Sequence, residues 1–355
     1  MMFMRVFHTL TWVVTLLELT VACRNPIDGV ALRTKAPITT GIIAIRLHDP
    51  AGNPLPTSSR VTLAGPDADK IVTTHGTTKY SVDAEGLLCL AVLPSLAPSS
   101  KEPIQFTLVI EADGYLTIVQ PITVTSRNRL TRTLRWIDLA RPPRTLAAGR
   151  ITKHAGADGA TSEPVALLTP SPPRSTDKAS VLLEPGTRLL DRDGKPVAGA
   201  VTLTTVYTNA REPATSQVPG GGRLFSVKSR DGRINPDPLR VLSMAGSVTL
   251  ESYSSAYQLA YSSSLPIVCY MDLNPATINA QTGRPIQPGD SIPLYSYDAV
   301  TRQWQPEKAG IVTRSLVGRL EYQVSVDRFL TYVAAWTAPA CDNDPVASVS
   351  RRPAN

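Results

Sequence analysis

The densest group of chemically active side chains is a set of arginines in the last third of the first half of the chain. Six of them fall within 18 residues: Arg127, Arg129, Arg132, Arg135, Arg141 and Arg144. If residues 127–136 are extended, alternation puts Arg129 and Arg135 on one face and Arg132 with Trp136 on the other. With a net charge of +7, such a stripe can bind an anionic polymer, for which Arg127, Arg129, Arg132 and Arg135 are the candidate residues. The alternative is a solvated edge strand whose charges discourage pairing with another strand.

Catalytic and metal-binding motifs are weak. Gly289-Asp290-Ser291 resembles the start of one esterase family, but that family has a histidine near its C-terminus, and here none follows His154. A turn entering a strand is the alternative. Asp191-x-Asp193-Gly194 resembles the opening of a calcium loop, yet Thr202 stands where the twelfth-position glutamate belongs, so a hairpin turn is favoured. We predict no catalytic residue, no metal site, no cofactor and no enzymatic activity.

Aromatic residues in the second half offer a different chemistry. A sugar-binding platform needs exposed aromatic rings on one face, and six residues could supply it: Tyr253, Tyr257, Tyr261, Tyr295, Tyr297 and Trp304. The alternative for these rings is packing between strands.

The N-terminus is typical of an export signal. Arg5 precedes an apolar stretch over residues 9–22, which is too short to span a membrane comfortably. Thr20-Val21-Ala22-Cys23 resembles the lipobox of bacterial lipoproteins, with Thr20 where that family usually has leucine. The resemblance implies that residues 1–22 are removed, that Cys23 carries a lipid, and that residues 23–37 form a tether. A cleaved secreted protein and an uncleaved anchor are the alternatives, and export argues against binding of intracellular nucleic acid.

The mature chain would keep three cysteines, so at most one disulfide can form. Cys269 and Cys341 could pair in an oxidising compartment, or both could stay unpaired, and Cys89 lies in an apolar run.

Composition and periodicity then predict the elements that carry these residues. The chain of 355 residues has 42% hydrophobic residues, 18% charged residues and 31 prolines, which disfavours helical bundles, coiled coils and polytopic membrane proteins. Alternation over residues 42–48 and 104–110 predicts strands, with Ile43, Ile45 and Leu47, and then Ile104, Phe106, Leu108 and Ile110, on the buried face. We therefore predict an all-β protein with two antiparallel β-sandwich domains joined by a proline-rich linker.

The expected boundaries follow from turn signals and composition. They are a first β-sandwich over 38–140, a Pro/Ala/Gly-rich linker over 141–179, a second β-rich domain over 180–340 and a disordered tail over 341–355. The turn at Asp49–Pro56, the step at Tyr80–Gly86 and Ile110-Glu111-Ala112-Asp113-Gly114-Tyr115 resemble the carboxypeptidase regulatory-like (transthyretin-like) sandwiches of exported bacterial proteins. That family implies a spacer or adhesive module without catalytic residues. Pro185–Thr187, Asp191–Pro196 and Val218–Gly221 more loosely resemble extracellular β domains of cartilage intermediate-layer-type proteins, which also implies no enzyme.

Together these features predict an exported, lipid-anchored protein of the cell envelope that acts as a structural or adhesive module. Its expected partners are the membrane, through the lipid on Cys23, and an envelope glycan or another surface protein. The alternatives are a carbohydrate-binding accessory lipoprotein and a hydrolase whose residues are not recognisable in the sequence.

Overall fold

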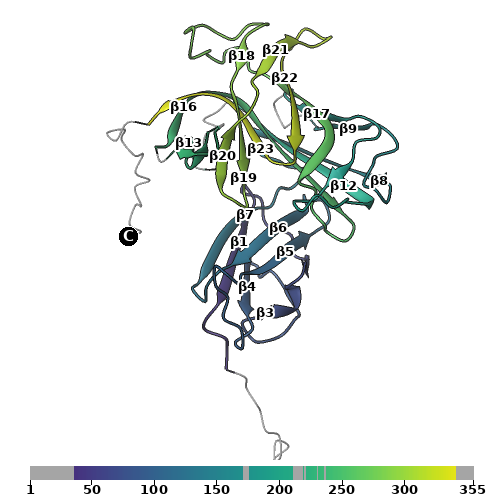
Figure 1. The fold of residues 1–355 in the computed structure, drawn as a ribbon, viewed down its shortest axis with the longest axis vertical. Helices are drawn as coiled ribbons and strands as arrows, with labels where there is room; N and C mark the ends of the chain where they lie inside the picture. Colours follow the sequence, from purple (N-terminus) through teal and green to yellow (C-terminus); the bar gives the residue numbers. More distant parts are fainter. Residues whose placement is uncertain are drawn as a thin grey trace, which may run out of the picture. The chain divides into compact units, whose positions relative to one another are not determined.

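Four β-sheets, arranged as two pairs with a hydrophobic core in each, make up the described part of the chain (Figure 1). The computed structural model describes residues 36–170, 176–210, 219, 221–229, 231–235 and 237–340. The predicted signal peptide, Cys23, Cys341 and the predicted tail lie outside these residues. Among those described, the 3-10 helix η1 (Ala68–Lys70) is the one helical element, so the all-β prediction is confirmed. None of the described residues form a helix long and apolar enough to cross a membrane.

The first sandwich contains seven strands. They are β1 (Ile42–His48), β2 (Arg60–Ala64), β3 (Ile71–Thr73), β4 (Leu87–Val92), β5 (Ile104–Glu111), β6 (Ile118–Val124) and β7 (Leu130–Arg135). One sheet has the order β3-β4-β1-β7 and the other β2-β5-β6. The inward residues predicted for residues 42–48 and 104–110 are all buried in the core between these sheets.

One strand pair departs from the predicted antiparallel arrangement. β1 and β7 run parallel, from Ile43 opposite Leu130 to His48 opposite Arg135. The chain reaches β7 from β6 in the opposite sheet, so no hairpin sets the direction of β7. β7 ends the order of its sheet, so the arginines at residues 127–135 lie on and beside an edge strand.

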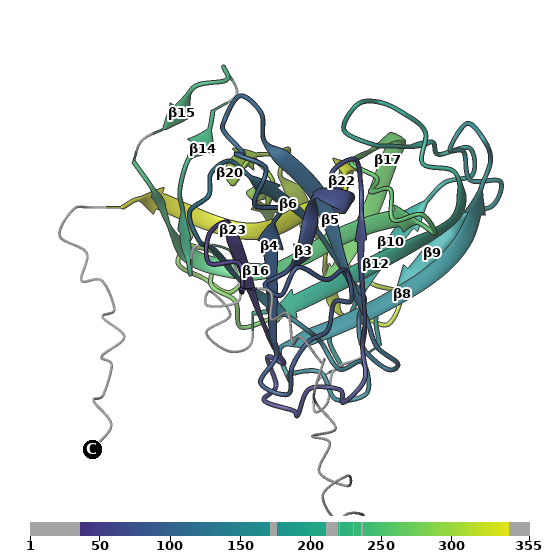
Figure 2. The same cartoon turned by 90° about the horizontal axis from the view of Figure 1, so that it is seen from below.

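The second sandwich contains sixteen strands. The first eight are β8 (Leu146–Ala155), β9 (Val165–Leu168), β10 (Ala179–Leu183), β11 (Leu189–Leu190), β12 (Gly199–Asn209), β13 (Arg223–Leu224), β14 (Val227–Lys228) and β15 (Ile234–Asn235). The others are β16 (Leu239–Ser254), β17 (Ser262–Asp272), β18 (Ser291–Ile292), β19 (Leu294–Asp298), β20 (Gln303–Pro306), β21 (Gly310–Arg314), β22 (Leu320–Arg328) and β23 (Thr331–Pro339). A seven-stranded sheet, β18-β21-β22-β17-β10-β9 with β11 beside β17, faces a nine-stranded sheet, β15-β14-β20-β19-β23-β16-β12-β8 with β13 beside β16. Figure 2 shows β8, β12 and β16 running side by side.

The predicted linker over 141–179 is wrong for most of its length. β8 pairs with β12 through ten residue pairs, β9 pairs with β10, and the second sandwich therefore begins at residue 146 instead of 180. The Ala/Gly-rich composition that suggested a linker permits close packing, because a Cβ on Gly149 would lie 3.2 Å from Cδ1 of Leu167. Residues 171–175 of this segment lie outside the described part.

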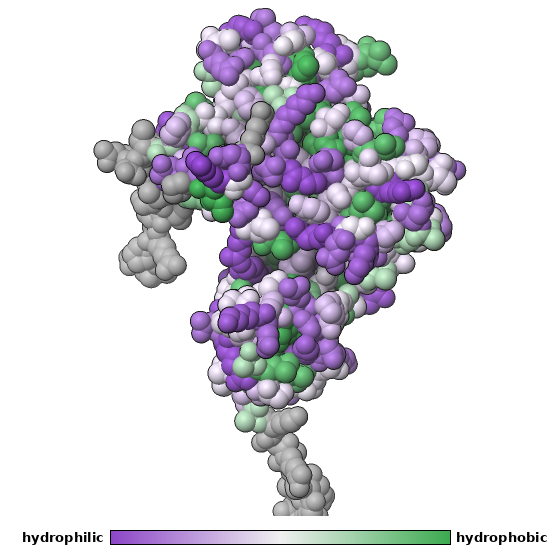
Figure 3. All heavy atoms as spheres, viewed as in Figure 1, coloured by the Kyte–Doolittle hydropathy of each residue, from purple (hydrophilic) through white to green (hydrophobic). Residues whose placement is uncertain are grey.

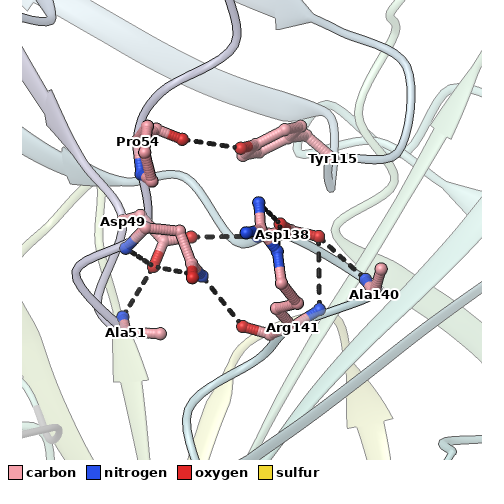
Figure 4. Close-up of polar contacts among 8 residues, drawn as sticks. Asp49, Ala51, Pro54, Tyr115, Asp138, Ala140 and Arg141 are labelled. Carbon is pink, nitrogen blue, oxygen red and sulfur yellow. Dashed lines mark hydrogen bonds and ion pairs between the residues drawn. The ribbon is translucent and has the colours of Figure 1, made fainter.

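A network of hydrogen bonds fixes the short connection between the sandwiches (Figure 4). The carboxylate of Asp49, at the end of β1, accepts hydrogen bonds from the backbone N–H groups of Ala51 and Asp138. Asp138 in turn accepts from the N–H groups of Ala140 and Arg141 and from Nε of Arg141, at 2.9 Å. The chain thus leaves the first sandwich through a hydrogen-bonded bend in which the carboxylates of Asp49 and Asp138 are buried.

Two apolar clusters join the sandwiches. The first contains Leu116 and Ile137 of the first sandwich and Leu146, Ala148 and Val206 of the second. The second packs Val109 of β5 and Val119 of β6 against Tyr253 of β16, with Tyr257 and Leu259 at its margin. The described residues from 38 to 340 accordingly belong to one compact unit.

Candidate functional site

A cleft of about 550 Å³ opens beside the second apolar cluster, between the outer face of β5 and β6 and the outer face of the nine-stranded sheet. This volume lies within the roughly 300–1,000 Å³ usual for small-molecule sites. Three further segments of the second sandwich, at turns and strand ends, add to its lining: residues 191–193, 256–261 and 297–300. The cleft is the candidate site.

Strand β16 supplies one wall because its side chains alternate. Leu250 points into the core of the second sandwich, whereas Thr249 and Glu251 line the cleft and Tyr253 packs in the contact with the first sandwich. Thr331 of β23 lies opposite Thr249 in the register, and their hydroxyl oxygens are 3.0 Å apart.

The first sandwich supplies the other wall with the reverse faces of its core strands. Gln105 and Thr107 of β5 stand opposite Thr123 and Pro121 of β6, and all four line the cleft. Farther along the same face, Val109 stands opposite Val119 and both are buried against Tyr253. The contact between the sandwiches therefore closes one end of the cleft.

Two aspartates of the rim are held in ionised form by their neighbours. Oδ1 of Asp191 accepts from the N–H groups of Asp193 and Lys195, and Oδ2 accepts from Nε2 of Gln258 at 2.9 Å. Burial alone would raise the pKa of Asp191, but these hydrogen bonds outweigh it and hold the pKa below its usual range.

At Asp298, too, burial and hydrogen bonding act on the pKa in opposite directions. Burial acts to raise its pKa, but the ion pair with Arg192, at 2.6 Å, and the N–H groups of Val300 and Thr301 lower it below the usual range. The guanidinium of Arg192 also lies 4.1 Å from the ring centroid of Tyr261, a cation–π contact.

Glu251 differs from these aspartates. Its side chain is half-buried, and among the described residues no hydrogen bond reaches its carboxylate. Burial raises the pKa of Glu251 to about 7, and the positive charge of Arg135 limits the rise. At neutral pH this carboxyl group can therefore either donate or accept a hydrogen bond.

The predicted arginine stripe is divided among different contacts. The guanidinium of Arg127 donates to the carbonyls of Pro94 and Leu96, and that of Arg132 donates to the carbonyl of Thr131. Burial lowers the pKa of Arg135, which lies near Glu251. Arg129 is exposed. Binding of an anionic polymer to this strand stays a prediction.

The six predicted aromatic residues do not form one exposed platform. Tyr253 and Trp304 are buried, and Tyr253 stacks on Tyr257 with the ring centroids 6.3 Å apart. Tyr297 packs against Trp304 at 4.9 Å, and the hydroxyl of Tyr295 lies 2.7 Å from that of Thr337. Three of the six gather at the cleft: Tyr257, Tyr261 and Tyr297.

The two weak motifs occur in turns. Asp191 to Lys195 form a hairpin turn closed by the Asp191 carboxylate, with Gly194 at φ 78°. Asp290 pairs with Arg284 at 2.8 Å, and Ser291 begins the short strand β18. No group of three or more His, Cys, Asp or Glu side chains that could hold a metal ion occurs among the described residues.

Two of the three cysteines of the predicted mature chain, Cys89 and Cys269, lie among the described residues. Cys269 points into the core as its alternation with Ile267 and Met271 predicts, and burial raises the pKa of its thiol to about 12. Cys89 is half-buried. The pairing of Cys269 with Cys341 stays a prediction.

One face of the molecule can be followed in Figure 3. On the face in Figure 3, hydrophilic side chains predominate and hydrophobic ones form small separate patches. No family model matches this chain, and no curated protein matches it as a relative.

Sequence reasoning missed Glu251 and the cleft. The available signal was Val109 and Val119, two large apolar residues on the faces of β5 and β6 that point away from the core, which mark a second contact surface.

Proposed function

We propose that this chain is an exported protein of the cell envelope, anchored by a lipid on Cys23, that serves as a non-enzymatic structural or adhesive module. Its membrane contact is the lipid, and its other partner is an envelope glycan or a second surface protein. Export rests on the signal-like residues 1–22 and on the lipobox resemblance at Thr20–Cys23.

The observation that carries the structural role is the double contact between the sandwiches. A spacer must hold its two ends at a fixed distance, which requires that its domains do not rotate freely about the connection between them. Here the connection is hydrogen-bonded through the buried carboxylates of Asp49 and Asp138, and two apolar clusters join the sandwiches as well. Burying one residue such as Val119 or Tyr253 in such a cluster contributes about 1.5–3 kcal/mol, so several together resist separation of the sandwiches.

A hydrolase is less well supported by the cleft. Asp191 and Asp298 are committed to turns and to Arg192, and their lowered pKa values make them poor proton donors at neutral pH. Glu251 is the carboxyl group of the cleft whose pKa is near neutrality. A general acid such as Glu251 needs a second catalytic group, a nucleophile or a general base, in reach of the substrate. Asp191 and Asp298 are instead bonded to the backbone of their turns and to Arg192.

The test is detergent-phase partitioning with intact-mass measurement, comparing the wild type with Cys23→Ala expressed in a bacterium with a lipoprotein pathway. The wild type should enter the detergent phase and have the mass of residues 23–355 plus a lipid. The Cys23→Ala protein should stay in the aqueous phase or keep its leader. A soluble wild-type protein that begins at another residue would overturn the anchor.

A further inference from the structure

We propose that the cleft between the sandwiches binds an uncharged, hydroxyl-rich ligand, namely a short neutral oligosaccharide. The observations are the cleft of about 550 Å³, a largely apolar lining that also carries amide, hydroxyl and carboxyl side chains, and three tyrosines at its margin. This function goes beyond the structural role and does not depend on the anchor.

The charges of the cleft disfavour an anionic ligand. Four carboxyl groups line it, those of Asp191, Asp193, Glu251 and Asp298, against the single guanidinium of Arg192. Asp191 and Asp298 are ionised, because hydrogen bonds and the ion pair hold their pKa values low. A phosphate, a sulfate or an acidic sugar would meet like charge on desolvation.

The cleft is also poorly suited to an organic cation. The strongest cation site in it combines the carboxylate of Asp298 with the ring of Tyr261, and the chain's own Arg192 occupies both. Glu251 is a weak counter-ion, since its carboxyl group is protonated part of the time at neutral pH. A cationic ligand would therefore find its best partners already taken.

The polar lining suits hydroxyl groups. Gln105, Thr107 and Thr123, on the cleft face of β5 and β6, carry an amide and two hydroxyls that both donate and accept, and the paired hydroxyls of Thr249 and Thr331 can still accept. A purely apolar ligand would remove water from these groups without replacing its hydrogen bonds, at a cost. A sugar hydroxyl replaces them, and its ring carbons can pack against Tyr257 or Tyr297.

The experiment is calorimetric titration of the full-length chain in a detergent whose headgroup is not a sugar. The neutral probes are maltotriose, cellotriose, xylotriose and triacetylchitotriose; trigalacturonate is the anionic comparator and spermidine the cationic one. The blocking variant is Val300→Arg, which adds bulk at an exposed turn residue that lines the cleft. Its matched control is Val317→Arg, at an exposed turn residue that does not line the cleft. Glu251→Gln keeps the shape of the wall.

We expect at least one neutral trisaccharide to bind with a Kd below about 1 mM. Val300→Arg should weaken it by about tenfold or more and Val317→Arg by less than about twofold, while Glu251→Gln should weaken it by about threefold. The proposal is overturned if no neutral probe binds at about 10 mM, if both arginine variants bind alike, or if trigalacturonate or spermidine binds more tightly than every neutral sugar. The anchor is judged separately by the partitioning of Cys23→Ala, so either idea can fail alone.

Discussion

At the scale of single residues, Glu251 combines an outward position on its strand with a half-buried carboxyl group. Its neighbours Thr249 and Tyr253 share its face of β16, and the first sandwich covers that face. Burial disfavours the charged form, and Arg135 offsets this only in part. The proximity of the sandwiches, rather than a bond to Glu251, sets its protonation.

The first prediction concerns the stability of Glu251→Gln as a function of pH. The pKa of Glu251 in the folded chain is about 7, above the roughly 4.3 of an unfolded glutamate, so the folded state binds this proton more tightly. The resulting stability is fully present below about pH 4 and is lost as the pH rises through about 7. Glu251→Gln should remove this loss and gain up to about 3 kcal/mol over the wild type at about pH 8.

Urea unfolding at about pH 5 and pH 8 measures the effect. Glu102→Gln, at an exposed loop residue, is the control and should keep the wild-type pH dependence. If the free energy of unfolding changes with pH in Glu251→Gln as it does in the wild type, the Glu251 carboxyl group is hydrated in the folded wild-type chain.

At the scale of elements, the connection over residues 136–145 matters most. It follows β7 at once and leads into β8, with Trp136 and Ile137 buried at its start. Asp138 bonds the backbone of the next turn, and its own N–H donates to Asp49. The connection is therefore built into the first sandwich.

The second prediction is that Asp138→Asn loosens this connection. Burial acts to raise the pKa of Asp138, but the N–H groups of Ala140 and Arg141 and the Arg141 guanidinium lower it below the usual range. Its stabilisation is thus present above about pH 4 and is lost as the pH falls through the folded pKa. Asp138→Asn should cost about 1–3 kcal/mol near pH 7, and the difference should narrow below about pH 4.

Urea unfolding near pH 7 and pH 3 checks this, with Asp113→Asn at an exposed turn as the control. Equal unfolding of wild type and Asp138→Asn near pH 7 would contradict the role of this carboxylate.

Elements with strict alternation could be predicted from the sequence, whereas elements of small residues could not. β5 was predictable because four large apolar residues face one core, and the burial of Ile104, Phe106, Leu108 and Ile110 confirms it. β8 was not, because Ala147, Ala148 and Gly149 have little side chain from which to read a period. Their strand is recognisable only through its pairing with β12 and its packing against β9 of the facing sheet.

The sequence was enough to select the tyrosines of the candidate cleft by residue type. It was not enough to predict which strands come together to form the cleft. Tyr257, Tyr261 and Tyr297 were sugar-site candidates by type, and they do line one cleft. Glu251 and Gln105 belong to different sandwiches and are 146 positions apart, so no local pattern could bring them together. Whether Tyr253 and Trp304 form an exposed sugar-binding platform or pack between strands depends on their burial. Tertiary contacts determine that burial, and both residues are buried.

At the scale of the whole chain, the two sandwiches behave as one body because they touch at two apolar clusters. Val109, Val119 and Tyr253 form a contact typical of a small core, and Leu116 with Leu146 belongs to a second one. Truncating Tyr253 to Ala should remove about 3 kcal/mol or more from this coupling. Tyr270→Ala, at a half-buried tyrosine of the seven-stranded sheet, is the matched control.

Thermal unfolding followed by calorimetry measures that coupling. We expect two separate transitions in the Tyr253→Ala protein and a single transition in the Tyr270→Ala control. Identical traces for Tyr253→Ala and Tyr270→Ala would show that Tyr253 does not hold the sandwiches together.

The most direct test of the central claim is calorimetric unfolding of the wild-type chain. If the sandwiches form one rigid unit, heating should give a single transition whose calorimetric enthalpy equals its van't Hoff enthalpy. Two resolved transitions, each with the enthalpy of one sandwich, would contradict the account, because the sandwiches would then fold independently and the cleft between them would not be a fixed feature.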